Sequence, residues 1–149
     1  MVRLYFLTSL IEDEVTTLSF ASGSEHSIED LTMTNDELAA IVGLARENAS
    51  RERTQSFFEL LEQTRYRALR PQLSIAVLQR YLKEHPEHLE EWERYSEDKR
   101  SSEGSYLSRL GPLWEVGELT PRRRQFFLSR SRACATFILR ELDMLATYL

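Results

Sequence analysis

The stretch TPRRRQFFLSRSRACATFILRELDMLATY, residues 120–148, decides the fold, because it holds the longest run of helical periodicity in the chain. Thr120 followed by Pro121 is typical of a helix start, since threonine caps a first turn and proline fits the first helical position. We therefore predict one continuous C-terminal helix that spans the domain, interrupted in its apolar stripe only at Arg130. The stripe consists of Phe126, Phe127, Ala133, Cys134, Phe137, Ile138, Leu142, Leu145 and Tyr148.

A second helix start lies at Thr34, which forms the capping-box pattern with Glu37. Upstream of it, residues 4–20 fit both a helical stripe and a β-rich composition, and we favour the helix. Residues 22–30 have the composition of a surface loop. The helix that begins at Thr34 is expected to pack through Leu38, Ile41, Val42, Ala45 and Ala49.

Three helices are predicted in the middle of the chain. Residues 51–70 form the first, which Pro71 ends. Residues 72–84 are apolar on more than one face and are predicted to form the central helix. Pro86 suits the first turn of a third helix, which reaches about Arg100. Its apolar stripe is thin, so we expect it on the surface, with Leu89, Trp92 and Tyr95 facing inward.

Residues 101–119 are rich in glycine and are predicted to form a loop that can contain a short β-hairpin near residues 105–119. The expected fold is thus mainly α, a single helical domain over residues 1–149 built as a bundle of five to six helices. The length fits one domain with a sizeable core.

Composition points to a soluble, cytoplasmic, globular protein. Hydrophobic residues make up 42% and charged residues 29% of the chain. Cys134 is the only cysteine, which excludes a disulfide-stapled secreted scaffold. The longest uncharged run, residues 15–24, is too short and polar to span a membrane. The acidic residues that follow residues 1–11 argue against a cleaved leader there.

Familiar catalytic and metal signatures are missing from the sequence. His85 and His88 flank Glu87 at a spacing seen in metal pairs, but Pro86 puts His85 at a capping position, and we interpret both as surface histidines. We expect neither a metal nor a cofactor. The scattered glycines do not match a phosphate-binding loop.

Cys134 and the paired carboxylates also fit structural roles better than catalytic ones. Cys134 lies on the apolar stripe, so a buried, unreactive thiol is predicted. The carboxylate pairs, Glu12 with Glu14 and Glu90 with Glu91, lack the apolar setting that separates two pKa values for acid–base catalysis.

A cluster of five arginines lies within eleven residues of the final predicted helix, and three of them, Arg122, Arg123 and Arg124, sit at its N-terminus. Cations are unfavourable at a helix N-terminus, so these arginines need a negative partner. That partner is an internal acid such as Glu115 or Glu118, a protein, or a phosphate. The cluster consists of Arg122, Arg123, Arg124, Arg130 and Arg132, of which the first three form the candidate anion-binding site.

Two other features suggest a protein interface. The first quarter of the chain is acidic, which would speed association with a basic partner. Both tryptophans and two tyrosines gather around the least regular segment, and such residues often dominate interfaces, although the tryptophans can instead pin the loop to the helices. The candidate partner-binding residues are Glu12, Asp13, Glu14, Trp92, Tyr95, Tyr106 and Trp114.

These observations favour a small non-catalytic protein-binding module, for example an immunity or inhibitor protein that neutralises a basic toxin or nuclease. A nucleic-acid-associated regulator that uses residues 122–132 is the second hypothesis, and an enzyme without recognisable motifs is the third. The sequence is also compatible with a homodimer, because the final helix can leave apolar surface uncovered.

Overall fold

The computed structural model describes residues 32–50, 54–99, 104–118 and 123–149, which all belong to one compact unit, residues 32–149. The predictions for residues 4–20 and 22–30 and for the acids Glu12, Asp13 and Glu14 lie outside the described residues. The described part is mainly helical, as predicted, and carries a small antiparallel sheet.

Seven α-helices and one short 3-10 helix occur in the described ranges. They are α1 (Asn35–Val42), α2 (Leu44–Ala49), α3 (Phe57–Gln63), α4 (Tyr66–Leu69), η1 (Arg70–Gln72), α5 (Ile75–Glu84), α6 (Glu87–Asp98) and α7 (Arg130–Ala146). None of these helices combines the length and the apolar character needed to cross a bilayer.

The helix start at Thr34 is confirmed. The Thr34 hydroxyl accepts a hydrogen bond from the Glu37 backbone N–H at 3.2 Å, and the Glu37 carboxylate accepts one from the Thr34 N–H at 2.9 Å. These hydrogen bonds lower the pKa of Glu37, the one from the Thr34 backbone most strongly. Ser56 and Glu59 repeat the same capping box at the start of α3.

The predicted single helix over residues 51–70 is wrong. Its described part begins only at Phe57, after the Ser56 cap, and Arg65 interrupts it between α3 and α4. Arg65 has φ of 56°, in the left-handed region, so the helical hydrogen-bond ladder cannot run through it. Pro71 lies in η1, consistent with the predicted end.

Three antiparallel strands follow α6 in the order β1-β2-β3. The predicted hairpin is confirmed by β1 (Ser105–Leu110) and β2 (Leu113–Glu118), which pair with Leu107 opposite Val116. The third strand, β3 (Arg123–Phe127), pairs with β2 so that Gln125 lies opposite Val116. Both ends of the tight β1-β2 connection are leucines, and Gly111 between them has φ of 59°.

The prediction of one continuous helix from Thr120 to Tyr148 is therefore wrong. Arg123–Phe127 is a strand, and α7 begins at Arg130 after the Ser129 side chain accepts a hydrogen bond from the Arg132 backbone N–H. The adjacent Phe126 and Phe127 fit either a helix or a strand, and pairing with β2 stabilises the strand. The long C-terminal helix itself is confirmed over its 17 residues.

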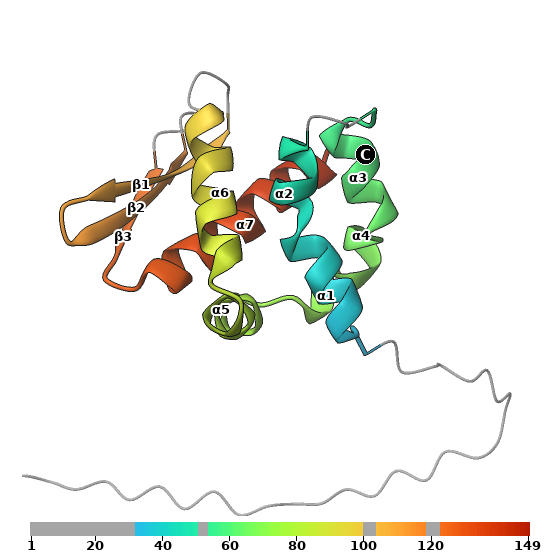
Figure 1. Ribbon diagram of the computed structural model, residues 1–149, viewed down its shortest axis with the longest axis horizontal. Helices are drawn as coiled ribbons and strands as arrows, with labels where there is room; N and C mark the ends of the chain where they lie inside the picture. Colours follow the sequence, from blue (N-terminus) through green and yellow to red (C-terminus); the bar gives the residue numbers. More distant parts are fainter. Residues whose placement is uncertain (1–31, 51–53, 100–103, 119–122) are drawn as a thin grey trace, which may run out of the picture. The chain divides into compact units, whose positions relative to one another are not determined.

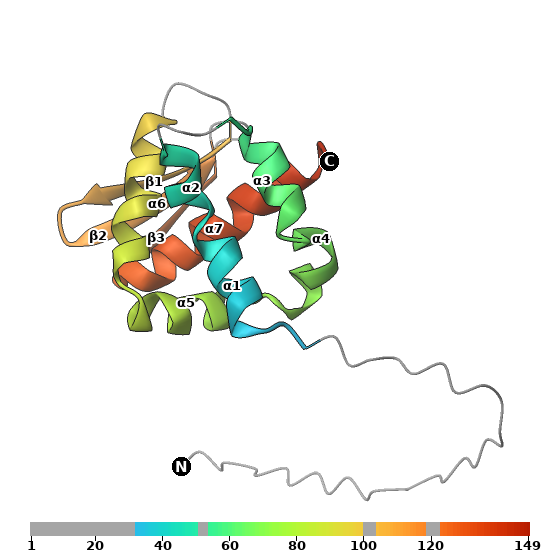
Figure 2. The ribbon, with the colours of Figure 1, turned by 45° about the vertical axis from the view of Figure 1, so that its right-hand side comes forward.

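The core is built around α7, not around the helix predicted to be central. In Figures 1 and 2, α7 runs through the middle, with the sheet and α6 at one end and α3 at the other. Ten α7 residues are buried, whereas α5 buries only Leu78 and Leu82 and exposes its other face. All three strands contact α7, and β1 also contacts α6.

Candidate functional site

Helix α6 presents an exposed, mainly acidic row of side chains, which we call the α6 ridge. Each of its residues lies three or four positions from another member, so together they form one broad face of the helix. The helix holds six acidic residues among twelve. The α6 ridge consists of Glu87, Glu90, Arg94, Glu97 and Asp98.

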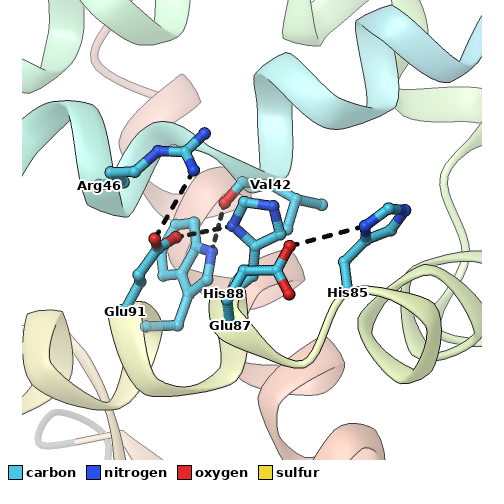
Figure 3. Close-up of polar contacts among 7 residues, drawn as sticks. Val42, Arg46, His85, Glu87, His88 and Glu91 are labelled. Carbon is cyan, nitrogen blue, oxygen red and sulfur yellow. Dashed lines mark hydrogen bonds and ion pairs between the residues drawn. The ribbon is translucent and has the colours of Figure 1, made fainter.

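The opposite face of α6 is fixed in the core, so the predicted arrangement, a surface helix with Leu89 and Trp92 facing inward, is confirmed. Trp92 is 0% exposed, and its indole N–H donates a hydrogen bond of 2.7 Å to the carbonyl oxygen of Val42 (Figure 3). On the same side, Arg46 of α2 lies 3.8 Å from the Glu91 carboxylate. Contacts with α2, α7 and β1 hold the helix on several sides.

A groove of 440 Å³ runs along one side of the α6 ridge and is called the Tyr95 groove here. It is lined by α2 and α6, and charged side chains of both signs surround the Tyr95 ring. The Tyr95 ring packs edge-on against Trp92, with ring centroids 5.3 Å apart. The charged lining residues are Arg46, Glu91, Arg94, Asp98 and Lys99.

Behind this groove lies a buried carboxylate, Glu141 of α7, which is 0% exposed. The Tyr95 hydroxyl donates to it at 3.0 Å, and the Lys99 ammonium forms a hydrogen-bonded ion pair with it. Its Oε2 atom has no hydrogen-bond partner among the described residues. Burial, followed by the charge of Glu141, raises the pKa of Tyr95, so the phenol stays protonated.

A second groove, of 470 Å³, lies on the other side of α6 between that helix and the sheet, and is called the Trp114 groove. The Trp114 ring has the guanidinium carbons of Arg109 and Arg130 at 6.0 and 5.7 Å from its centroid. Glu93 binds Arg130 through two hydrogen bonds of 2.5 and 3.0 Å, which raise the pKa of Arg130. Glu97 also lines this groove.

The two histidines do not converge on a common point. His88 Nδ1 lies 2.7 Å from Glu91, whereas His85 Nδ1 lies 3.6 Å from Glu87 (Figure 3). Their ring centroids are 6.3 Å apart, and no set of three metal-ligating side chains occurs among the described residues. The interpretation of His88 as a surface residue is wrong, because it is only 4% exposed and packs near Tyr81.

The four candidate aromatic residues are not gathered into one patch. Tyr95 and Trp114 lie in the two grooves beside α6, while Trp92 is enclosed in the core and offers a partner no surface. Tyr106 lies on the face of the sheet that points away from the helices, where its ring covers Gly117. A Cβ atom at Gly117 would come within 2.3 Å of that ring, so glycine is required there.

Arg123 and Arg124 are not at a helix N-terminus, contrary to the prediction, whereas Arg130 and Arg132 lie in the first turn of α7. Arg123 and Arg124 are exposed on β3, and Arg122 lies outside the described residues. The Arg124 guanidinium lies 3.2 Å from the Glu115 carboxylate, which also accepts a 2.7 Å hydrogen bond from Tyr106. Internal pairing with Glu115, one of the alternatives, is thus present for Arg124.

The prediction that Cys134 is a buried structural thiol is confirmed. It is 0% exposed within α7. Burial raises its pKa, which disfavours the reactive thiolate.

Sequence reasoning missed several residues that shape this region. Glu141 gave a readable signal, since it is a charged residue within the apolar stripe of the final helix, and such a residue needs a buried partner. Arg109, Glu93 and Glu97 gave none, because only the packing of β1 and β2 beside α6 makes them neighbours.

No known protein-family model matches the chain, and neither a curated protein nor a solved structure matches it.

Proposed function

We propose that this chain is a non-catalytic protein-binding module that acts by occupying a macromolecular partner through the α6 ridge and its two grooves. The partner we propose is a basic toxin or nuclease, which makes the protein an immunity or inhibitor protein. The observation that carries the proposal is the exposed acidic ridge with an aromatic ring in the groove on each side.

The two aromatic rings support binding because they are held in place before a partner arrives. Tyr95 is held by Trp92 and Glu141, and Trp114 is held by Arg109 and Arg130. Tyrosine, tryptophan and arginine contribute most of the energy of many interfaces, and rigid side chains lose little entropy on binding.

The charge of the ridge supports a basic partner. Acidic side chains at the rim of an interface speed the approach of a positively charged protein and disfavour acidic competitors. Residues 1–31 add six acidic residues against one arginine to the charge of the chain.

Charge reversal on the ridge tests the proposal. The ridge variant is Glu90→Lys with Asp98→Lys. The matched control, Glu62→Lys with Glu84→Lys, changes the net charge of the chain by the same amount on α3 and α5. All four carboxylates are on exposed residues. Proteins crosslinked to the full chain in its native cells are identified by mass spectrometry, and the partner's toxic or nuclease activity is then assayed with added chain.

We expect one basic partner that is captured by the wild type and the control and lost with the ridge variant, and whose activity the wild type suppresses. Equal capture by the ridge variant contradicts the proposal. An acidic partner, or an unaffected partner activity, contradicts the inhibitor assignment.

Nucleic-acid binding is the second candidate, favoured by the exposed Arg123, Arg124 and Phe126 on β3. Arginines bind phosphates, and aromatic rings on a sheet stack on bases. The Glu115 carboxylate beside Arg124 weakens this case. Fluorescence anisotropy with labelled single-stranded RNA and duplex DNA tests it: Arg123→Ala and Arg124→Ala should weaken binding stepwise, and absence of binding at low salt excludes it.

A further inference from the structure

The two edges of the three-stranded sheet differ in how their backbone groups are used. At the β1 edge, the Ser96 hydroxyl accepts a hydrogen bond from the Leu107 N–H at 2.7 Å and donates one to the Leu107 carbonyl at 3.0 Å. Helix α6 therefore covers that edge at Leu107. At the β3 edge, no described residue makes such a bond, and four of the five strand residues are exposed.

The backbone groups that β3 directs outward follow from the register. Since Leu107 uses its N–H and C=O toward Ser96, the opposite residue, Val116, directs its own toward β3. Gln125 lies opposite Val116 and so points its backbone groups inward. Successive residues alternate along a strand, which leaves the N–H and C=O groups of Arg124 and Phe126 facing outward.

We propose that a second copy of this chain pairs antiparallel along β3, with the two-fold axis at Gln125, to form a continuous six-stranded sheet. The outward groups of Arg124 in one copy then exchange two hydrogen bonds with those of the partner's Phe126. The two-fold axis repeats this exchange, so that four backbone hydrogen bonds form between the two β3 edges. An isologous contact of this kind closes at two copies.

The side chains of β3 fit its own copy. In the one two-fold register that pairs all five residues, Arg124 lies beside the partner's Phe126 and Arg123 lies beside the partner's Phe127. No arginine faces an arginine, and each guanidinium meets an aromatic ring, a favourable cross-strand pair.

Charge on an edge strand usually hinders pairing, but here one charge is already compensated. The Arg124 guanidinium lies 3.2 Å from the Glu115 carboxylate of the neighbouring strand. Phe126 is 55% exposed, and pairing would cover it. This surface is distinct from the α6 ridge, so the inference does not depend on the proposed function.

Cysteine crosslinking of the full chain tests the register. Gln125 and the partner's Gln125 form a non-hydrogen-bonded pair, whose Cα atoms are about 4.5 Å apart, within disulfide range. Gln125→Cys should crosslink under mild oxidation at least about tenfold more than the control Arg123→Cys. In the control, the two copies of residue 123 lie about 13 Å apart across the dimer, beyond disulfide reach. The native thiol, Cys134, is buried and does not compete. Equal crosslinking of both variants overturns the proposed register.

Analytical ultracentrifugation tests the dimer itself. The wild type should sediment with twice its monomer mass of 17.5 kDa at high concentration. Phe126→Pro removes an outward N–H without touching the ladder to β2, so it should raise the dimer Kd at least about tenfold while circular dichroism shows an unchanged fold. A wild type that stays monomeric, or a dimer that Phe126→Pro leaves unchanged, overturns the proposal.

Discussion

The indole N–H of Trp92 and the carbonyl oxygen of Val42 are 2.7 Å apart, which ties α6 to the last turn of α1. Trp92 is 0% exposed, so water cannot replace either partner. Since the opposite face of α6 carries the α6 ridge, this hydrogen bond helps to fix the position of the proposed binding surface.

Replacing Trp92 with phenylalanine should cost about 2–4 kcal/mol of stability, because the Val42 carbonyl loses its donor and a cavity remains. Urea unfolding measures the loss. Trp114→Phe is the matched control, and it should cost about 1 kcal/mol or less, since Trp114 is only half-buried and phenylalanine keeps its contact with the two arginines. Equal losses in the two variants would show that the hydrogen bond to Val42 contributes little.

The Ser96 hydroxyl covers the β1 edge at Leu107, and Ser96→Ala should cost about 1–3 kcal/mol because it leaves the N–H and C=O of Leu107 without partners. Ser108→Ala removes a hydroxyl from a half-buried position next to Leu107 on β1 and should change stability by less than about 0.5 kcal/mol. Amide exchange of Leu107 should accelerate in the Ser96 variant alone. Unchanged exchange at Leu107 contradicts the assigned role of Ser96.

Lys99 compensates the buried carboxylate of Glu141, so Lys99→Met should destabilise the fold by about 3–5 kcal/mol. The reason is that the buried Glu141 carboxylate would be left with only the Tyr95 hydroxyl as a partner. The double variant Lys99→Met with Glu141→Leu should recover most of that loss, which thermal and urea unfolding can measure. Failure of the double variant to recover stability would place the effect in packing and not in charge.

Alkaline pH should destabilise the fold through Cys134. Burial raises the pKa of the folded thiol, whereas the unfolded thiol ionises near about pH 8.5. Above that pH the unfolded state binds fewer protons than the folded state, so stability falls as pH rises. Between pH 8 and 10 the wild type should lose about 2 kcal/mol more than Cys134→Ala in reducing buffer. Parallel pH profiles of the two proteins contradict this.

The local capping signal at Thr34 predicted a helix start correctly, whereas non-local pairing with β2 made a strand of the stretch predicted to continue the helix from Thr120. Thr34 with Glu37 is a contact within one turn, so the sequence contains all of it. The strand at Arg123–Phe127 exists because β2 pairs with it, and that partner cannot be identified from the five residues themselves. The same cause explains why Trp92, although expected to face inward, was also named as a partner-binding candidate, since its complete burial depends on α2, α7 and β1 meeting around α6.

The site was partly predictable for the same reason. Tyr95 and Trp114 could be named from residue type, because aromatic residues near irregular segments often lie at surfaces that bind. That the two residues lie on opposite sides of one acidic helix could be seen only in the structure.

Hydrogen–deuterium exchange of the full chain, with and without the partner that it captures, tests the central claim most directly. We predict that the partner slows exchange in α6, residues 87–98, and in the lining of the Tyr95 and Trp114 grooves. It should leave the outer edge of β3 unchanged. Protection confined to β3 or to α3 and α4, with α6 exchanging as in the free chain, would contradict the account.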